Sequence, residues 1–161
     1  MKSILLLFIL FLSLSLKAQE KIALYSPDAD ARKDLEMAIQ NARDQHKHVL
    51  IQVGGNWCPW CVRLHDVFES EAKIDSILKS DYVFLLINYS KENKNEVLLA
   101  DLGFPQRFGF PVLLVLDQEG HRMHTQNTAY LEKDKGYDKD KIIGFLLDWN
   151  EKALDPKSYV K

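Results

Sequence analysis

The two cysteines of this chain, Cys58 and Cys61, are separated by only two residues, and no other feature constrains the fold as strongly. A short apolar run, residues 49–53, comes just before them and has the length and β-branched content of a strand. Pro59 suits the first turn of a helix, because the N–H that it lacks would have no intrahelical partner there. The pattern therefore predicts a strand, a tight turn, and a helix that carries both cysteines at its start.

This placement predicts different chemistry for the two sulfurs. Cys58 falls at the helix N-terminus, where free N–H groups and the helix dipole favour a thiolate and lower the pKa of the thiol. Cys61 lies one turn further into the helix and is expected to be more covered. Cys58 would then attack a substrate disulfide, and Cys61 would resolve the mixed disulfide that forms.

Two other uses of a close cysteine pair fit this chain less well. A zinc site needs four ligands, and the sequence offers only histidines (His46, His48, His121 and His124) to complete one. A structural disulfide would close a loop too short to constrain much of the chain, and secreted domains that depend on disulfides usually carry four or more cysteines. We therefore expect a redox pair, with no metal and no cofactor.

His65 lies four residues after Cys61, so one helix face can carry this histidine together with both cysteines. One interpretation makes His65 a local base or an electrostatic tuner of the thiols. The simpler interpretation, which we favour, makes it a surface residue of an amphipathic helix.

The first 18 residues have the three-part pattern of a secretory signal. Lys2 supplies a basic start, residues 4–16 form an apolar run, and Ala18 offers a small residue near a cleavage point. The run is too short for a membrane-spanning helix, which needs about 20 residues. An uncleaved anchor remains the alternative, because Lys17 is unusual so close to a cleavage site. We expect a mature domain of residues 19–161 in the periplasm or secreted, with no stable membrane span.

The charge balance argues against nucleic acid as a partner. Without residues 1–18 the chain keeps 19 basic and 23 acidic side chains, whereas nucleic-acid-binding proteins usually present a basic face. The most highly charged stretch, residues 132–141, alternates in sign. This pattern is typical of a solvated loop.

The rest of the chain predicts a single α/β domain with the order α-β-α-β-α-β-β-α. Strands separated by helices favour parallel pairing, and the last two strands form a hairpin, which together give a mixed sheet with helices on both faces. The run at 82–87 is apolar throughout, as in a buried central strand. The expected helices are 28–45, the stretch after Cys58, 74–78, 96–101 and 138–152, and the expected strands are 49–53, 82–87, 112–116 and 122–126.

Three features, in this order, resemble the thioredoxin superfamily. The first is the strand at 49–53 followed by residues 57–61 (WCPWC), since a tryptophan commonly precedes the nucleophilic cysteine in that family. The second is residues 107–115 (RFGFPVLLV), which are similar to the family's cis-proline segment and run straight into a strand. The third is the turn at Gly120 between hairpin strands, followed by a C-terminal helix. The resemblance covers roughly residues 32–152.

The resemblance implies a thioredoxin-like fold and roles for several residues. Cys58 would be the nucleophile, Cys61 the resolving thiol and Pro111 the cis-proline beside them, with Pro105 as a rival for that position. The main chain of Phe110 would pair with an extended segment of the substrate.

The two tryptophans of the motif, Trp57 and Trp60, are expected to contribute to substrate binding. The sequence also departs from the family pattern. Many thioredoxins carry a buried aspartate six residues before the first cysteine, where this chain has Gln52, and the strand at 82–87 lacks the usual lysine. The segment 90–106 is longer than usual and is a candidate for specificity.

These features predict a thiol–disulfide oxidoreductase that acts on protein or peptide disulfides, with reduction as the preferred direction and a separate electron donor or acceptor as its redox partner. Oxidation or isomerisation of disulfides is the close alternative. A second class of function is a binding module that holds its partner through Phe108, Phe110 and Trp60. The alternative for these aromatic residues is packing in the core, which we expect for Phe108 more than for Trp60.

Overall fold

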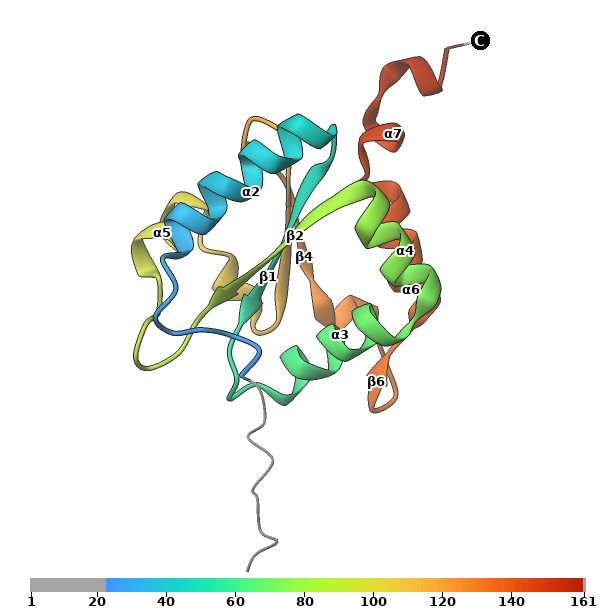
Figure 1. Ribbon diagram of the computed structural model, residues 1–161. Coiled ribbons are helices and arrows are strands. Elements are labelled where there is room, and N and C mark those ends of the chain that lie inside the picture. The colour runs from blue at the N-terminus through green and yellow to red at the C-terminus, as the bar shows by residue number, and fades with distance from the viewer. Residues whose placement is uncertain (1–22, 161) are drawn as a thin grey trace, which may run out of the picture.

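A computed structural model of the chain describes residues 23–160 (Figure 1). The predicted signal segment, residues 1–18, lies outside this range. None of the helices within 23–160 combines the length and the apolar character that a membrane span requires.

Four strands form the central sheet, in the order β2-β1-β3-β4. β1 pairs in parallel with β2, as expected for two strands joined through helices, and antiparallel with β3. β3 and β4 form the predicted antiparallel hairpin. The mixed sheet of the sequence analysis is therefore confirmed, with strand bounds His48–Gly54 (β1), Tyr82–Asn88 (β2), Val112–Leu116 (β3) and Arg122–Asn127 (β4).

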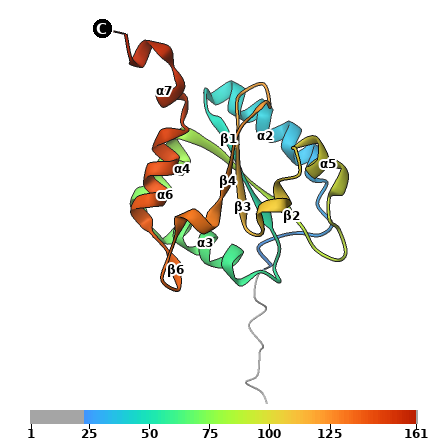
Figure 2. The same ribbon diagram turned by 180° about the vertical axis from the view of Figure 1, so that it is seen from behind.

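Helices cover both faces of the sheet, as Figures 1 and 2 show from opposite sides. α2 (Ala31–Gln45) and α5 (Glu96–Asp101) lie on one face. The other face carries three helices, α3 (Pro59–Ser70), α4 (Ala72–Asp81) and α6 (Lys139–Asp148). The resulting three layers enclose two separate apolar cores.

The alternation of side chains along β1 builds both cores at once. Val49, Ile51 and Val53 point to the α2 face, and Leu50 points to the α3 face. Gln52 is a polar residue near the end of the strand, and it is completely buried. Its amide bonds to the Cys61 carbonyl, so Gln52 lies beneath the start of α3.

The position of β2 corrects one expectation. Its apolar run predicted a central strand, but within residues 23–160 β2 lies at an edge of the sheet. The run is apolar because α2 packs against one face of β2 and α4 against the other. An edge strand that helices cover on both faces can therefore be as apolar as a central strand.

The C-terminal third contains more regular structure than the sequence predicted. Residues 132–141 were expected to form a solvated loop, but they hold a two-stranded hairpin of β5 (Glu132–Lys133) and β6 (Gly136–Tyr137). The helix predicted over 138–152 ends at Asp148, and Asn150 caps a separate short helix, α7 (Glu151–Leu154). The irregular stretch before β3 includes a 3-10 turn, η1 (Pro105–Phe108).

Candidate active site

Cys58 and Cys61 form a disulfide at the N-terminus of α3, directly after β1. Cys58 is the N-cap residue, and its sulfur accepts a hydrogen bond from the Cys61 N–H at 3.2 Å. Pro59 occupies the first turn, as predicted. Cys58 retains 4% of its surface and Cys61 none, so the first cysteine is the one that a substrate can reach.

The turn between β1 and α3 depends on the close approach of other groups to its glycines. A Cβ added to Gly55 would lie 2.5 Å from the indole Nε1 of Trp57 and 2.6 Å from the carbonyl oxygen of Tyr89. Those two groups form a hydrogen bond of 2.6 Å across the glycine. Gly55 is therefore required for the indole of Trp57 to take its place beside the disulfide.

The peptide bond between Phe110 and Pro111 is cis, which confirms the choice of Pro111. The rival, Pro105, begins η1 instead. Phe110 packs against the cluster that contains both cysteines. The buried hydroxyl of Thr128, in the 3-10 turn η2 (Thr128–Leu131), donates to the Pro111 carbonyl at 2.5 Å and so links this segment to the end of β4.

The main chain of Phe110 is available for pairing with another strand. Within residues 23–160, neither its N–H nor its C=O forms a hydrogen bond with the protein. β3 begins its pairing with β4 only two residues later, at Val112. An extended peptide laid beside Phe110 would therefore find an unoccupied donor and acceptor.

An aromatic wall made of Trp57, Tyr89 and Phe110 lies on one side of the disulfide. Trp57 is 56% exposed, yet the hydrogen bond to Tyr89 and an edge-on contact with Phe110 hold its ring in place. The rings of Tyr89 and Phe110 pack at 4.6 Å. Next to this wall is a largely apolar pocket of about 500 Å³, which the residues of the long segment after β2 help to line: Trp57, Tyr89, Ser90, Lys91, Glu92 and Lys94.

A second wall, made of Trp60 and Tyr137, lies on the hairpin side of the site. The two rings meet edge to face with their centroids 5.5 Å apart, and the guanidinium of Arg63 lies over Trp60 at 5.0 Å. The Tyr137 hydroxyl donates to the Trp60 carbonyl at 3.4 Å. Burial raises the pKa of Tyr137, so this hydroxyl stays protonated.

The structure adds Tyr25 to the site, a residue that the sequence analysis did not identify. Tyr25 is 1% exposed and packs in the same cluster as Cys58 and Cys61. Its hydroxyl accepts a hydrogen bond from the side-chain amide of Gln52 at 2.5 Å. Tyr25 precedes the region that resembles the family, so no motif pointed to it. The only signal was an aromatic residue just before the first helix.

Two residues singled out from the sequence differ from expectation. His65 is not a plain surface residue, because its side chain is 16% exposed, stacks on Phe84 and pairs with Glu69 at 3.2 Å. These partners lie outside the cluster around the disulfide, so His65 is not part of the site. Phe108, expected in the core, is 38% exposed beneath the guanidinium of Arg107.

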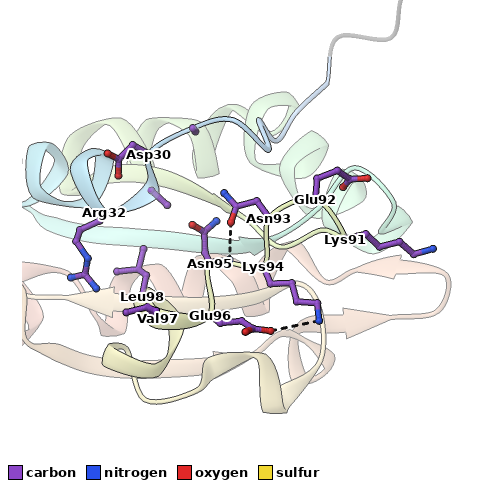
Figure 3. Close-up of a pocket in the computed structure, with 12 residues that line it drawn as sticks. Asp30, Arg32, Lys91, Glu92, Asn93, Lys94, Asn95, Glu96, Val97 and Leu98 are labelled. Carbon is purple, nitrogen blue, oxygen red and sulfur yellow. Dashed lines mark hydrogen bonds and ion pairs between the residues drawn. The ribbon is translucent and has the colours of Figure 1, made fainter.

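A further hollow lies between the start of α2 and residues 91–98 (Figure 3). Charged and amide side chains line it, among them Asp30, Arg32 and Asn95, and Lys94 pairs with Glu96 at its edge. Neither cysteine borders this hollow. Its chemistry is therefore separate from that of the disulfide.

The sequence matches a known family, and the fold is similar to those of solved structures. A family profile described as "Thioredoxin-like" matches residues 30–118. A disulphide isomerase from Xylella fastidiosa Temecula1 is similar in structure, with a TM-score of 0.66 and 23% identity over 78% of this chain and 95% of that chain. The reduced C-terminal domain of Neisseria meningitidis DsbD has a TM-score of 0.55 and 20% identity, over 74% and 96% of the two chains. No curated protein matches the chain.

The two cysteines differ in exposed surface and in position relative to the helix N-terminus. This difference predicts selective alkylation after reduction. Iodoacetamide should modify Cys58 much faster than Cys61 at neutral pH, because Cys58 lies at the helix N-terminus and keeps some exposed surface. The pH dependence of the rate should give Cys58 a pKa moderately below the value of about 8.5 for a free thiol. Mass spectrometry of the peptides measures both effects. Equal modification of the two cysteines would contradict the prediction.

Proposed function

Because this chain belongs to the thioredoxin-like family, we propose that its Cys58–Cys61 pair cycles between dithiol and disulfide to reduce disulfide bonds of proteins outside the cytoplasm. The chain is a thiol–disulfide oxidoreductase, as the resemblance at residues 57–61 and 107–115 implied.

One observation carries the proposal: a disulfide lies at the start of α3, and Phe110, which packs against the same cluster, has an unpaired main chain. A substrate segment paired with Phe110 would bring its own disulfide to the side of Cys58 that is open to solvent. Holding the two reacting groups together in this way lowers the entropic cost of the exchange.

The proposed cycle is balanced in electrons and protons. The Cys58 thiolate attacks one sulfur of the client disulfide, and the other client sulfur leaves as a thiolate and takes up a proton. Cys61, once deprotonated, then attacks Cys58, which releases the second client thiol and forms the Cys58–Cys61 disulfide. A separate thiol donor must return two electrons to this disulfide before the next cycle.

Reduction is the favoured direction because little in the site stabilises the reduced pair. A disulfide becomes a strong oxidant when its reduced form is stabilised. Here the Cys58 sulfur accepts a single N–H, from Cys61, and apart from the uncharged phenol of Tyr25 the side chains packed around the pair are apolar: Leu24, Trp60, Leu86 and Phe110. Apolar burial opposes a thiolate, which supports a potential nearer to that of thioredoxin than to that of a periplasmic oxidant.

The two aromatic walls support a protein or peptide as the substrate. Trp57 presents a large apolar surface in a fixed orientation, so binding a client there costs little side-chain entropy. The apolar pocket next to Trp57 can take a side chain of the client. Trp60, which packs against the cysteine cluster and is held by Tyr137, would contact the client through a second aromatic surface.

The proposed cycle predicts a reversible redox couple with a low potential. Equilibration of residues 19–161 with glutathione buffers, read by thiol trapping, should give a value near about −270 mV. A value toward about −120 mV would mark an oxidant and overturn the proposed direction.

A Cys58→Ser/Cys61→Ser variant provides the control for the enzymatic class. It should lose all reduction of a protein disulfide. If no reversible couple is found and the double variant keeps its biological effect, the binding-module alternative takes the place of the enzyme.

The proposed role of Trp57 predicts a substrate-dependent defect. Trp57→Ala should slow reduction of a protein disulfide such as insulin by about tenfold, in line with aromatic anchors at interfaces, and should change the reduction of a small aromatic disulfide much less. Comparing kcat/KM for the two substrates measures the effect. Tyr159→Ala, which removes an aromatic ring of 71% exposure, is the matched control. Equal losses on both substrates would contradict a role in client binding.

The proposed compartment rests on residues 1–18, since disulfide exchange in proteins belongs mainly to oxidising compartments. Expressed with this segment in a Gram-negative bacterium, the protein should appear in the periplasmic fraction with residues 1–18 removed, as measured by intact mass. Leu10→Arg, which interrupts the apolar run, should keep it in the cytoplasm. An unprocessed protein in the membrane fraction would show an anchor instead.

A further inference from the structure

The buried hydroxyl of Tyr25 lies at the base of the disulfide, held by Gln52. The Gln52 amide nitrogen donates to the Tyr25 hydroxyl at 2.5 Å and to the Cys61 carbonyl at 3.1 Å. The Cys61 carbonyl fixes this orientation of the amide, because the reverse orientation would bring two oxygens together. The Tyr25 oxygen therefore accepts a hydrogen bond from Gln52, and its own proton remains available for a different acceptor.

The sulfur of Cys61 is a candidate acceptor for this proton. A Cβ added to Gly54 would lie 2.5 Å from Cys61 Sγ and 2.7 Å from the Tyr25 hydroxyl, so both groups converge on the same point beside the glycine. Tyr25 and Cys61 also belong to one buried cluster. Gly54 is the residue that leaves room for this approach.

The main chain of Tyr25 is held in place from the active-site turn itself. The Asn56 side chain accepts from the Tyr25 N–H at 2.9 Å and donates to the Tyr25 carbonyl at 2.7 Å. Asn56 stands two residues before Cys58 in the sequence. The loop that carries the cysteines thus also positions Tyr25 beneath them.

We propose that the Tyr25 hydroxyl donates a hydrogen bond to the Cys61 sulfur and stabilises it as a thiolate when the disulfide opens or re-forms. This inference rests on the proposed redox cycle and adds a residue to it. Tyr25 keeps its proton throughout, because burial raises its pKa far above the physiological range. The proton that Cys61 loses before it attacks Cys58 passes to solvent or to the departing client thiolate.

The surroundings of Cys61 offer few other polar groups for this task. The side chains that pack with the pair are apolar apart from Tyr25, and Gln52 beneath it carries no charge. The titratable residues nearby on α3 are directed elsewhere, since Arg63 lies over Trp60 and His65 pairs with Glu69. Among the described residues, Tyr25 is therefore the hydroxyl best placed to influence Cys61.

The test follows the two steps of thiol exchange separately. The reduced protein is mixed with dithiobis(nitrobenzoate), and stopped-flow absorbance records one release of thionitrobenzoate as Cys58 attacks and a second as Cys61 resolves the mixed disulfide. Tyr25→Phe should slow the second release about tenfold at neutral pH, the loss expected for a hydrogen bond to a charged group. The apparent pKa of that step should rise by about one pH unit, while the first release stays close to wild type.

Tyr82→Phe is the matched control, because it removes another buried hydroxyl, bonded to the Leu146 carbonyl at 2.6 Å, at the far end of β2. It should leave both releases and the pH profile unchanged. Asn56→Ala frees the main chain of Tyr25 while keeping its hydroxyl, and should slow the second release in the same direction by a smaller factor.

The outcomes separate this inference from the proposed function. If Tyr25→Phe lowers only the melting temperature and leaves the pH profile of the second release unchanged, Tyr25 is a packing residue and the inference fails. If the wild-type protein shows no second release at all, Cys61 does not resolve and the proposed cycle itself fails.

Discussion

The contact between the end of β1 and the start of α3 is the constraint on which the site depends. Cys61 packs so closely against Gly54 that any side chain there would collide with its sulfur. This close contact fixes the helix against the sheet, and the helix in turn fixes Cys58 at its N-terminus. Since β1 has strands on both sides, the disulfide is attached to a well-supported part of the fold, as a pre-organised site requires.

Three hydrogen bonds between segments far apart in sequence hold residues around the disulfide. The Trp57 indole bonds to the carbonyl of Tyr89, and Thr128 bonds to the carbonyl of Pro111. The hairpin residue Tyr137 bonds to the carbonyl of Trp60. These bonds explain how large side chains with exposed surface keep one orientation, which reduces the entropy that a binding partner would have to remove.

The interior beneath the cysteines is polar without carrying charge. The position six residues before Cys58, for which the resemblance implied a carboxylate, holds Gln52 on β1, bonded to Tyr25 and to the main chain of Cys61. Neither side chain changes its charge near neutral pH, because the amide does not titrate and burial raises the pKa of the phenol. The pH dependence of the thiol chemistry should therefore come mainly from the thiols themselves.

The sequence by itself determined the strand–turn–helix unit around Cys58 and Cys61, the hairpin after Pro111 and the order of the main elements. These depend on local spacing and on alternation, which can be read within a few residues. Only the tertiary structure decided that β2 lies at an edge among the described strands, that residues 132–137 form a hairpin against Trp60, and that Tyr25 reaches the disulfide. These features depend on contacts between segments far apart in the chain, and no local pattern records such contacts.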